Sequence, residues 1–418
     1  MTDQSLSIAI LSQTDTGGGA TLVPARLHRA LRSQGIDSHL IVSQRSPTSD
    51  PFTHTIPTPY IPARIAEKLF NRALLTLGLR NIAHLSTPSI AQIPAFKKSP
   101  VINIHNIHGD YLNYLALPRL LRHKTVLITL HDMWNFTGHC VYSFDCQRWK
   151  TGCGRCPYLN TYVETRRDAS ALELRLKRKT FTRIQPHFIA ISRWILNAFR
   201  QSQLSHLPIH HIPNGIDTDT YRPIPKDFAR NLLHLPQNKK IILYAAANLN
   251  DPRKGADLLI RSLALLPASL KQTTLLITIG TPPKTPDPDI GLPIRHLGFI
   301  HDDITKNIIL NAADLLAFPT RADNLPLIIQ EAMAAGLPTL SFRVGGVPDL
   351  IRHEDNGLLA EPENIEAFSH YLTLLLTHDL LRLSMSERNR IIATTEYPLP
   401  LQAQRYLELV RNVLNTPL

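Results

Sequence analysis

The sequence predicts two α/β domains, each built on a doubly wound parallel sheet. At 418 residues the chain is longer than one hydrophobic core usually supports, and its hydrophobic content of 43% is ample for two. Short apolar runs alternate with longer helix-period segments almost throughout. This alternation restarts after a Pro-, Gly- and Asp-rich stretch at about 211–225, which we interpret as a linker.

The first half begins the alternation with five runs rich in Ile, Val and Leu. They read LSIAILSQ, SHLIVSQ, VINIHNIH, TVLITLHD and HFIAIS, which is typical of buried parallel strands. Helix candidates lie between them, such as LVPARLHRALRSQG, where Gly35 is a plausible stop. We predict an N-terminal domain over 1–210.

The second half repeats the pattern. Its apolar runs are KIILYAAAN, LLITIGT, IRHLGF, DLLAFPT and PTLSF, separated by helix candidates such as GADLLIRSLALL, ITKNIILNAA and LIIQEAMAAG. One last helix candidate, LQAQRYLELVRNVL, follows EYPLP. We predict a C-terminal domain over 211–396 and a closing helix over 397–418 that packs on the N-terminal domain.

The positive charge is concentrated in the first half. Residues 1–210 carry 25 Lys and Arg against 11 Asp and Glu, a net +14, and the remaining 20 against 22 give −2, so that the chain totals +12. The asymmetry indicates an anionic partner such as a membrane surface, a phosphorylated acceptor or nucleic acid; an incidentally basic solvated face is the alternative. No apolar run reaches the roughly 18 residues of a membrane span, and the first residues do not resemble a signal peptide. We therefore expect a cytoplasmic protein.

One segment of the second half combines several ligand-binding features. In FPTRADNLPLIIQEAMAAGLPTLSFRVGGVPD a strand ends near Pro319 and a helix begins near Leu327. Unsatisfied amides and the helix dipole favour a phosphate at such a helix start. Asp323 precedes the helix and Glu331 lies inside it, with seven residues between them. Gly345 and Gly346 form a later strand-to-helix turn, where backbone can approach a ligand closely. These features are, in order, Pro319, Asp323, Leu327, Glu331, Gly345 and Gly346.

This segment resembles the C-terminal signature of the retaining GT-B glycosyltransferases of family 4, also called glycosyl transferases group 1. An acid, seven residues and a Glu there precede sequences similar to EAMAAGLP and VGGVPD. The resemblance implies two Rossmann-like domains that face each other across a cleft, with the nucleotide sugar bound in the C-terminal one. It places Glu331 at the ribose hydroxyls, and Asp323 with the backbone of Asn324 and Leu325 at the donor sugar and phosphates. Asp323 stands where the family more often has Glu.

Two cations follow the first strand of the second domain. In NLNDPRKGADLL, Arg253 and Lys254 precede Gly255 and a helix, where they can neutralise a pyrophosphate. The family resemblance implies an Arg about five residues upstream of the Lys, near Leu249 in this chain. Arg253 therefore either substitutes for it or faces solvent, while Lys254 is the diphosphate ligand unless it is an ordinary surface lysine.

The first domain adds a glycine loop and three histidines. Gly17, Gly18 and Gly19 separate the first strand from its helix, and we expect close approach by donor phosphate or acceptor there, with a purely structural turn as the alternative. His105 and His108 end a buried strand at the edge that faces ligands in such sheets. The family resemblance favours His105 as the functional histidine, then His108, with His131 of the next strand third. They also fit satisfied structural roles.

All four cysteines lie in LHDMWNFTGHCVYSFDCQRWKTGCGRCPYLN, an insertion over 131–160. Cys140, Cys146, Cys153 and Cys156 have the spacing Cys-x5-Cys-x6-Cys-x2-Cys, which leaves structural zinc, packing thiols and disulfides open. The stretch resembles an insertion in family members associated with colanic-acid and exopolysaccharide biosynthesis. We expect the cysteines to hold a loop together rather than to perform the chemistry.

Two predicted helices are candidates for a membrane surface. Arg64, Lys68 and Arg72 are spaced four residues apart, with Ile65 and Leu69 on another face. A second segment carries four basic residues, Arg175, Lys177, Arg178 and Lys179. Such helices can lie on anionic lipid, and a solvated helix face is the alternative.

The sequence as a whole predicts a retaining glycosyltransferase of the hexosyltransferase type. It would move a sugar from a nucleotide-sugar donor to a glycan or lipid-linked acceptor in cell-surface polysaccharide biosynthesis, for instance exopolysaccharide or lipopolysaccharide. The resemblance implies catalysis without a cofactor, and the only metal we expect is structural zinc. The competing hypotheses are a GT-B-fold sugar-nucleotide epimerase and a zinc-containing nucleic-acid-binding protein, although no nucleic-acid partner is expected. We expect the enzyme at the inner face of the cytoplasmic membrane.

Overall fold

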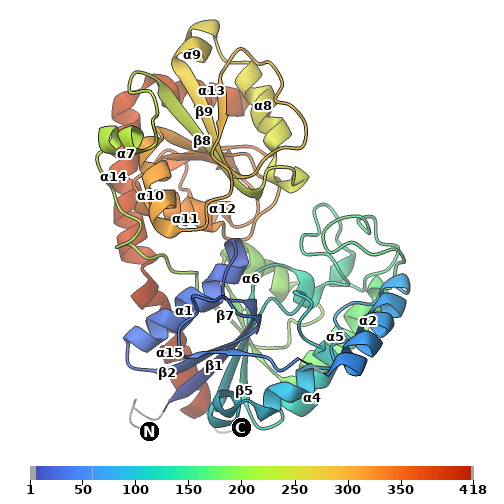
Figure 1. Ribbon diagram of the computed structural model, residues 1–418. Coiled ribbons are helices and arrows are strands. Elements are labelled where there is room, and N and C mark those ends of the chain that lie inside the picture. Colours follow the sequence, from blue (N-terminus) through green and yellow to red (C-terminus); the bar gives the residue numbers. More distant parts are fainter. Residues whose placement is uncertain (1–5, 59, 416–418) are drawn as a thin grey trace. The chain divides into compact units, whose positions relative to one another are not determined.

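The computed structural model describes residues 6–58 and 60–415 and falls into two compact units (Figure 1). The N-terminal unit takes the described residues up to Pro213 together with those from Gln402 on, and the C-terminal unit takes Asn214–Leu401. The chain therefore passes between the units twice, at 213/214 and at 401/402. The sequence placed these two boundaries at 210/211 and 396/397.

The N-terminal unit is built on a seven-stranded sheet in the order β3-β2-β1-β4-β5-β6-β7. Every neighbouring pair in it is parallel. The strands are β1 (Ser7–Thr14), β2 (Asp37–Gln44), β3 (Thr53–Thr55), β4 (Val101–His105), β5 (Thr125–Leu130), β6 (His187–Ala190) and β7 (Ile209–His211). The order runs outward in both directions from the β1–β4 pair, which makes the sheet doubly wound.

The helices of the N-terminal unit lie between these strands. They are α1 (Leu22–Ser33), α2 (Ile61–Thr76), α3 (Pro94–Lys98), α4 (Leu117–Leu120), α5 (Ser170–Ile184) and α6 (Arg193–Arg200), with short 3-10 turns η2 (Gly19–Thr21), η3 (Thr87–Gln92), η4 (Tyr114–Ala116), η5 (Trp134–Phe136) and η6 (Arg148–Lys150). Helix α15 (Leu399–Asn415) belongs to this unit from Gln402 on. Its Tyr406 is buried, and the Oη atom lies 2.9 Å from Oγ1 of Thr129 on β5.

The C-terminal unit repeats the architecture with a six-stranded parallel sheet in the order β10-β9-β8-β11-β12-β13. Its strands are β8 (Lys240–Asn248), β9 (Thr274–Thr281), β10 (Ile294–His296), β11 (Leu315–Phe318), β12 (Thr339–Phe342) and β13 (Gly357–Ala360). Its helices are α7 (Lys226–Leu232), η7 (Pro252–Lys254), α8 (Ala256–Ala264), α9 (Ala268–Thr273), α10 (Asp303–Ala312), α11 (Leu327–Ala334), α12 (Val347–Leu350), α13 (Ile365–Thr377) and α14 (Asp379–Glu396). The prediction of two doubly wound α/β domains is confirmed.

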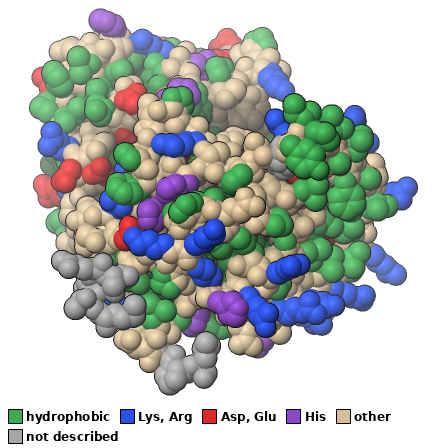
Figure 2. All heavy atoms as spheres, turned by 60° about the horizontal axis from the view of Figure 1, so that its bottom comes forward, with side chains coloured by type: hydrophobic (Ala, Val, Ile, Leu, Met, Phe, Trp, Pro, Cys, Tyr) green, Lys and Arg blue, Asp and Glu red, His purple; other side chains and the backbone are tan. Residues whose placement is uncertain are grey.

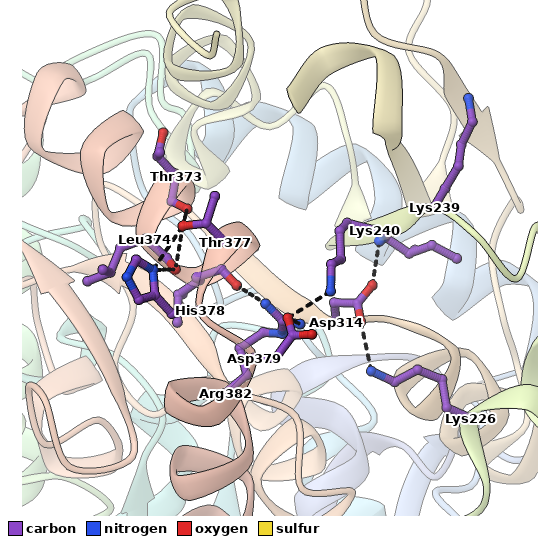
Figure 3. A network of polar contacts seen from close by, with 12 residues as sticks. Lys226, Lys239, Lys240, Asp314, Thr373, Leu374, Thr377, His378, Asp379 and Arg382 are labelled. Atoms are coloured by element: carbon purple, nitrogen blue, oxygen red, sulfur yellow. Dashed lines mark hydrogen bonds and ion pairs between the residues drawn. The ribbon is translucent and has the colours of Figure 1, made fainter. Parts of the chain in front are cut away.

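A polar network closes the amino-terminal edge of the second sheet (Figure 3). Asp314 is buried, and it accepts hydrogen bonds from Lys226 Nζ at 2.7 Å, Arg230 Nη2 at 2.8 Å and the Ile241 backbone N–H at 2.6 Å. Burial acts to raise the pKa of Asp314, but Lys226 and the other donors outweigh it and hold that pKa below its usual value. Because the network lies at the amino-terminal edge, it supports the sheet and leaves the carboxyl edge for ligands.

No helix in the part of the chain that the structure describes is long and apolar enough to cross a bilayer.

Candidate active site

A lysine and an aspartate meet at the carboxyl edge of the second sheet. Lys254 ends η7, which follows β8, and Asp323 lies in the loop between β11 and α11. β8 and β11 are neighbours in the sheet, so the loops that leave them lie side by side. The Lys254 Nζ atom donates to Asp323 Oδ2 at 2.5 Å. Strand order thus brings together two residues that are 69 positions apart in the sequence.

Burial and pairing shift the pKa of both members of this pair. Burial lowers the pKa of the Lys254 ammonium group, and Asp323 opposes that shift. Burial also acts to raise the pKa of Asp323, but Lys254 and Arg253 outweigh it, so that this pKa lies below its usual value. Their side chains keep 17% and 12% of their surface exposed, so the ion pair is accessible at the sheet edge.

Arg253 belongs to the same cluster. Its Nη1 atom donates to the Ala322 carbonyl at 2.9 Å and lies 3.4 Å from Asp323 Oδ2, while Nη2 donates to Asp251 Oδ2 at 3.1 Å. Leu249, the upstream position where the family resemblance implies an arginine, is instead 5% exposed and packed in the apolar core. The Arg253 side chain is 25% exposed and held in this cluster, and its substitution for the upstream arginine stays a prediction.

The glycine turn after β12 fits closely against Asp323. Gly345 has a φ of +53°, and a β-carbon there would lie 1.9 Å from the Asp323 carbonyl oxygen. The Gly346 N–H donates to that same oxygen at 3.0 Å. Asn324 and Leu325, which follow Asp323, are buried. Any side chain at Gly345 would therefore displace the loop that carries Asp323.

Glu331 lies on α11 beside a cation that the sequence did not single out. Its carboxylate is 3% exposed, and Oε1 lies 3.3 Å from Nζ of Lys306 on α10. Lys306 also donates to Tyr221 Oη at 3.1 Å. The sequence shows Lys306 only as one polar residue in a predicted helix, and no spacing signal links it to Glu331.

Arg321 is a second residue that the sequence did not single out. Its guanidinium donates twice to Asp257, at 2.8 and 2.7 Å, and once to the Pro252 carbonyl at 2.7 Å. Its backbone N–H donates to the Arg253 carbonyl at 2.8 Å. These bonds tie the β11–α11 loop to η7, and so hold Asp323 next to Lys254.

Histidines occupy the corresponding edge of the first sheet. His105 is fully buried, with Nδ1 2.8 Å from His131 Nε2 and Nε2 2.9 Å from Asn103 Nδ2. Burial lowers the pKa of His105 well below its usual value and that of His131 to about 3. Both rings are therefore neutral at physiological pH, and neighbours occupy both nitrogens of His105.

His108 is placed differently. Its Nε2 atom lies 3.3 Å from Asp132 Oδ2, and its ring packs 5.8 Å from that of Trp134. Its Nδ1 atom is buried and has no hydrogen-bond partner within the described residues. Of the two strand-end candidates, His108 thus retains a free ring nitrogen.

The predicted glycine loop follows β1 and is exposed. Gly17 and Gly19 have φ angles of +113° and +59°. Thr21 Oγ1 donates to the Gly18 carbonyl at 3.0 Å and closes the turn. The backbone at Gly18 and Gly19 is open to a ligand, and the same geometry also fits a structural turn.

Comparison with known protein families identifies the chain. The profile of "Glycosyltransferase Family 4" matches residues 17–220, and that of "Glycosyl transferases group 1" matches residues 225–391. The putative colanic acid biosynthesis glycosyl transferase WcaC of Escherichia coli is 28% identical over 360 residues, which are 84% of this chain and 86% of WcaC. This chain belongs to family 4 of the glycosyltransferases.

Further comparisons agree with this assignment. The lipopolysaccharide glucosyltransferase WaaG of Escherichia coli is 31% identical over 189 residues, which are 43% of this glycosyltransferase and 50% of WaaG. Sucrose-phosphate synthase from Thermosynechococcus elongatus superposes with a TM-score of 0.71 at 19% identity, covering 98% of this chain and 99% of that one. HepE of Anabaena, solved with UDP and glucose, has a TM-score of 0.67 at 17% identity over 97% and 99%. The predicted GT-B fold and enzyme class are confirmed, and neither the epimerase nor the nucleic-acid binder is supported.

The four cysteines of this glycosyltransferase line one pocket in the N-terminal unit. Cys140, Cys146, Cys153 and Cys156 are all free, so the structure contains none of the disulfides that the spacing left open. His139 lines the same pocket, and its Nε2 atom lies 3.1 Å from Cys156 Sγ. As the side chains lie, no three His, Cys, Asp or Glu groups among the described residues are arranged to hold an ion. Zinc in this pocket stays a prediction.

The cysteine loop is anchored by a buried lysine. Lys177 Nζ on α5 donates to the carbonyl oxygens of Trp134, Thr137 and Gly138 at 2.9, 3.1 and 3.0 Å. Burial lowers the pKa of Lys177 to about 8. The prediction that Lys177 belongs to a lipid-facing surface is wrong, because the side chain points into its own unit.

Proposed function

We propose that this enzyme transfers a sugar, with retention at the anomeric carbon, from a nucleotide sugar to a glycan or lipid-linked saccharide in cell-surface polysaccharide assembly. The cluster of Arg253, Lys254 and Asp323 at the carboxyl edge of the second sheet carries the proposal. The functions of two relatives support the pathway, since WcaC is a putative colanic acid biosynthesis glycosyl transferase and WaaG is a lipopolysaccharide glucosyltransferase.

The two cations of the cluster are the proposed diphosphate ligands. Lys254 and Arg253 both contact Asp323, so the two cations already hold one anionic group. A nucleoside diphosphate would bring stronger acceptors to the same donors. Negative charge grows on the departing diphosphate as the sugar bond breaks, and fixed cations lower the barrier by stabilising that charge.

The other residues of this edge are assigned to the sugar and the nucleoside. Asp323 and the backbone of Asn324 and Leu325 would contact the donor sugar and its phosphates, and Glu331 the ribose hydroxyls. Lys306 lies 3.3 Å from Glu331 Oε1 and would hold that carboxylate in place for this role. Gly345 and Gly346 pack against the Asp323 carbonyl and add no side chain to this edge, which would permit close approach of the donor. These five assignments apply to Asp323, Asn324, Leu325, Glu331 and the Gly345–Gly346 turn.

At the other sheet we assign the strand-end histidines to the acceptor and the reacting centre. His108 would hydrogen-bond a sugar hydroxyl or stabilise developing positive charge, and Asp132 orients its ring. His105 supports the same edge through its bond to His131. Gly18 and Gly19 leave exposed backbone for the donor phosphate or the acceptor.

Catalysis is proposed to need no metal ion or other cofactor. Arg253 and Lys254 supply two positive charges where a metal-dependent transferase would place its cation. Transfer should therefore persist at an unchanged rate in excess EDTA. A rate that falls with EDTA and returns on addition of Mg²⁺ or Mn²⁺ would contradict this part of the proposal.

A thermal-shift screen of nucleotide sugars tests the function. A donor that binds the folded state raises the melting temperature by mass action. At a donor concentration one hundred times its dissociation constant, the free energy of unfolding rises by about 2.7 kcal/mol. We expect one UDP-, GDP-, ADP- or dTDP-sugar to do so, and Glu331→Ala to remove the shift. Glu366→Ala is the matched control, since Glu366 is an exposed acid on α13 of the same unit. If no nucleotide sugar stabilises the protein, the proposal fails.

We also propose that the enzyme works at the inner face of the cytoplasmic membrane, as a peripheral protein. A lipid-linked acceptor lies in that membrane, and the N-terminal half carries the excess of positive charge that anionic headgroups attract.

A further inference from the structure

Helix α2 leaves an apolar face uncovered in its own unit. Ile61, Ile65 and Leu69, spaced four residues apart, are 71%, 55% and 64% exposed. Phe70 in the helix and Leu77 directly after it, at 50% and 51%, widen the stripe toward the C-terminal end. We call these five residues the α2 face. Leu74 is the one residue of this 16-residue helix that is buried.

Ordinary packing does not account for such a helix. A surface helix of a globular protein usually turns its apolar side to the core and its charged side to water. In α2 most of the large apolar side chains point outward instead, and a contiguous exposed apolar surface of this kind marks an interaction site. Figure 2 shows hydrophobic side chains gathered, with Lys and Arg around them, on the side of the view where α2 lies in Figure 1.

Basic side chains border the α2 face along one edge. Arg64, Lys68 and Arg72 are all exposed and follow one another at four-residue intervals. On a helix with 3.6 residues per turn they form a row next to the stripe of Ile61, Ile65 and Leu69. The exposed surface of α2 is therefore apolar in the middle and cationic at its edge.

The single acid of α2 is turned away from this surface. Glu67 Oε2 accepts a hydrogen bond from the Leu85 backbone N–H at 3.0 Å, and Oε1 lies 3.5 Å from His84 Nδ1. The Glu67 carboxylate therefore interacts with groups inside the N-terminal unit. The α2 face and its rim carry positive charge only.

Two more arginines lie beyond the C-terminal end of the helix. Gly78 packs against the Arg167 carbonyl, which a β-carbon at position 78 would approach to 2.1 Å. Arg80 Nη1 donates to the Glu164 carbonyl at 3.0 Å. These contacts place beside the end of α2 a loop that carries Arg166 and Arg167 together with the acids Glu164 and Asp168, all exposed, so the loop adds no net charge.

We propose that the α2 face docks on an anionic phospholipid bilayer, with α2 lying in the membrane plane. Its apolar side chains would enter the boundary between headgroups and acyl chains, while Arg64, Lys68 and Arg72 contact lipid phosphates. The proposal deepens the proposed function, since a lipid-linked acceptor is presented at that same surface. Here the structure adds the element and the residues that meet the lipid.

Charge complementarity favours an anionic lipid surface, rather than a second copy of the chain, as the partner of the α2 face. A symmetric contact between two α2 faces would bring the basic rows of both copies together, without an acid on either surface to pair with them. A membrane surface rich in acidic lipids instead attracts each exposed basic residue. Helix α5 contributes less than the sequence indicated, because Lys177 is buried.

Vesicle co-sedimentation of the full-length protein tests the proposal. We expect binding to vesicles of phosphatidylglycerol and phosphatidylethanolamine, weakening as salt is raised, and little binding to pure phosphatidylcholine. The triple variant Arg64→Gln, Lys68→Gln, Arg72→Gln should lower the partition coefficient by about 100-fold, since each basic residue contributes about a factor of five. The double variant Ile65→Ser, Leu69→Ser should lower it at least ~10-fold.

A matched control exists on another helix. Leu380 and Leu383 on α14 are 83% and 59% exposed and have no basic row beside them in α14's first turns. Leu380→Ser with Leu383→Ser should leave vesicle binding unchanged. Circular dichroism and the nucleotide-sugar thermal shift should be unchanged in all three variants, because none touches the donor site.

Three results would overturn the membrane proposal. The first is equal binding of the wild-type protein to neutral and anionic vesicles, and the second is unchanged vesicle binding of both α2 variants. The third is a wild-type dimer in light scattering that Ile65→Ser with Leu69→Ser converts to a monomer, when neither the wild-type protein nor that variant binds vesicles. Each is distinguishable from a failure of the proposed function, which would appear as the absence of any donor-induced thermal shift in the wild-type protein.

Discussion

The carboxyl edges of the two sheets hold different chemistry, although the sheets share one topology. In the C-terminal unit the edge presents acid–base pairs, with Lys254 paired to Asp323 and Lys306 beside Glu331. In the N-terminal unit the edge presents imidazoles, and burial holds His105 and His131 neutral.

This difference teaches that the net charge of each half of the chain does not indicate where a small anion would bind. The N-terminal half carries +14 and the other half −2, yet Lys254 and Arg253, the cations that we propose for a diphosphate, lie in the second unit. In the first unit the exposed basic residues of α2 lie on a helix surface, where they can meet an extended anionic partner. Local pairing therefore indicates a small anionic ligand, and diffuse charge indicates a surface.

The largest effect should follow Lys254→Ala. It removes the cation closest to Asp323 and leaves a buried carboxylate with weaker compensation, and it deprives the departing diphosphate of a fixed donor. We expect kcat to fall by about 10²–10³-fold, as for other preorganised donors, with the circular dichroism spectrum unchanged. Steady-state kinetics with the donor found by the screen measure this.

Lys284→Ala, which removes an exposed lysine of the same unit, is the control and should keep full activity. Turnover at the wild-type rate in both Lys254→Ala and Glu331→Ala would contradict the site assignment. The difference between the two sheet edges would then have no role in catalysis.

A second test targets the glycine turn behind Asp323. Gly345→Ala and Gly298→Ala both place a β-carbon on a residue with positive φ, which costs about 1–2 kcal/mol. At Gly345 the new atom also meets the Asp323 carbonyl, whereas at Gly298 nothing lies within 4 Å. Urea unfolding should show the larger loss for Gly345→Ala.

Donor affinity separates the two glycine variants further. It should fall only in Gly345→Ala, because that substitution shifts the loop that carries Asp323. Equal stability and equal donor affinity in the two variants would show that the close contact at Gly345 does not position the aspartate.

The neutral histidines predict a pH dependence of stability. Unfolded histidine binds a proton below a pKa of about 6.5, whereas folded His131 does so only near pH 3. The unfolded state therefore binds more protons between these values, and the free energy of unfolding should fall by up to about 1.4 kcal/mol per pH unit for each such histidine as the pH drops below 6.5. Urea titrations at pH 7 and pH 5 measure the difference.

His131→Gln is the informative variant for that series, since glutamine can still hydrogen-bond His105 but does not titrate. It should show a smaller loss between pH 7 and pH 5 than the wild type. The same loss in both proteins would mean that His131 is protonated in the folded state, and the contrast of a charged edge with a neutral one would not hold.

The smallest effect on donor binding is expected from the cysteine pocket. If the zinc prediction holds, purified protein contains about one zinc ion per chain, and its removal by a chelator loosens the loop over 131–160 without changing the donor-induced thermal shift. Elemental analysis and hydrogen exchange of that loop measure both. Metal-free protein with a fully protected loop would show that Cys140, Cys146, Cys153 and Cys156 pack as thiols.

Much of the fold and part of the candidate site could be predicted from local patterns. The alternation of apolar runs with helix-period segments depends on residues close in sequence, so it identified the two parallel sheets. The Asp323–Glu331 spacing and the Gly345–Gly346 pair are also local. Lys254 was identifiable because it stands at a strand-to-helix turn.

Other features depended on contacts between distant residues. Lys306 reaches Glu331 across 25 positions, and Arg321 reaches Asp257 across 64. Neither pair has a spacing signal, because helix packing and strand order bring the partners together. Burial was equally hidden, since Lys177 looks like any basic residue of an amphipathic helix until its three carbonyl partners are seen.

The sequence by itself determined the two doubly wound sheets, the family and the residues of the donor motif, because periodicity and short spacings are set by local backbone geometry. Only the tertiary structure decided which charges are paired, which histidine keeps a free nitrogen, and that α2 turns its apolar side outward. Those outcomes depend on which surfaces the folded chain leaves without a partner, and that is a property of packing between elements far apart in sequence.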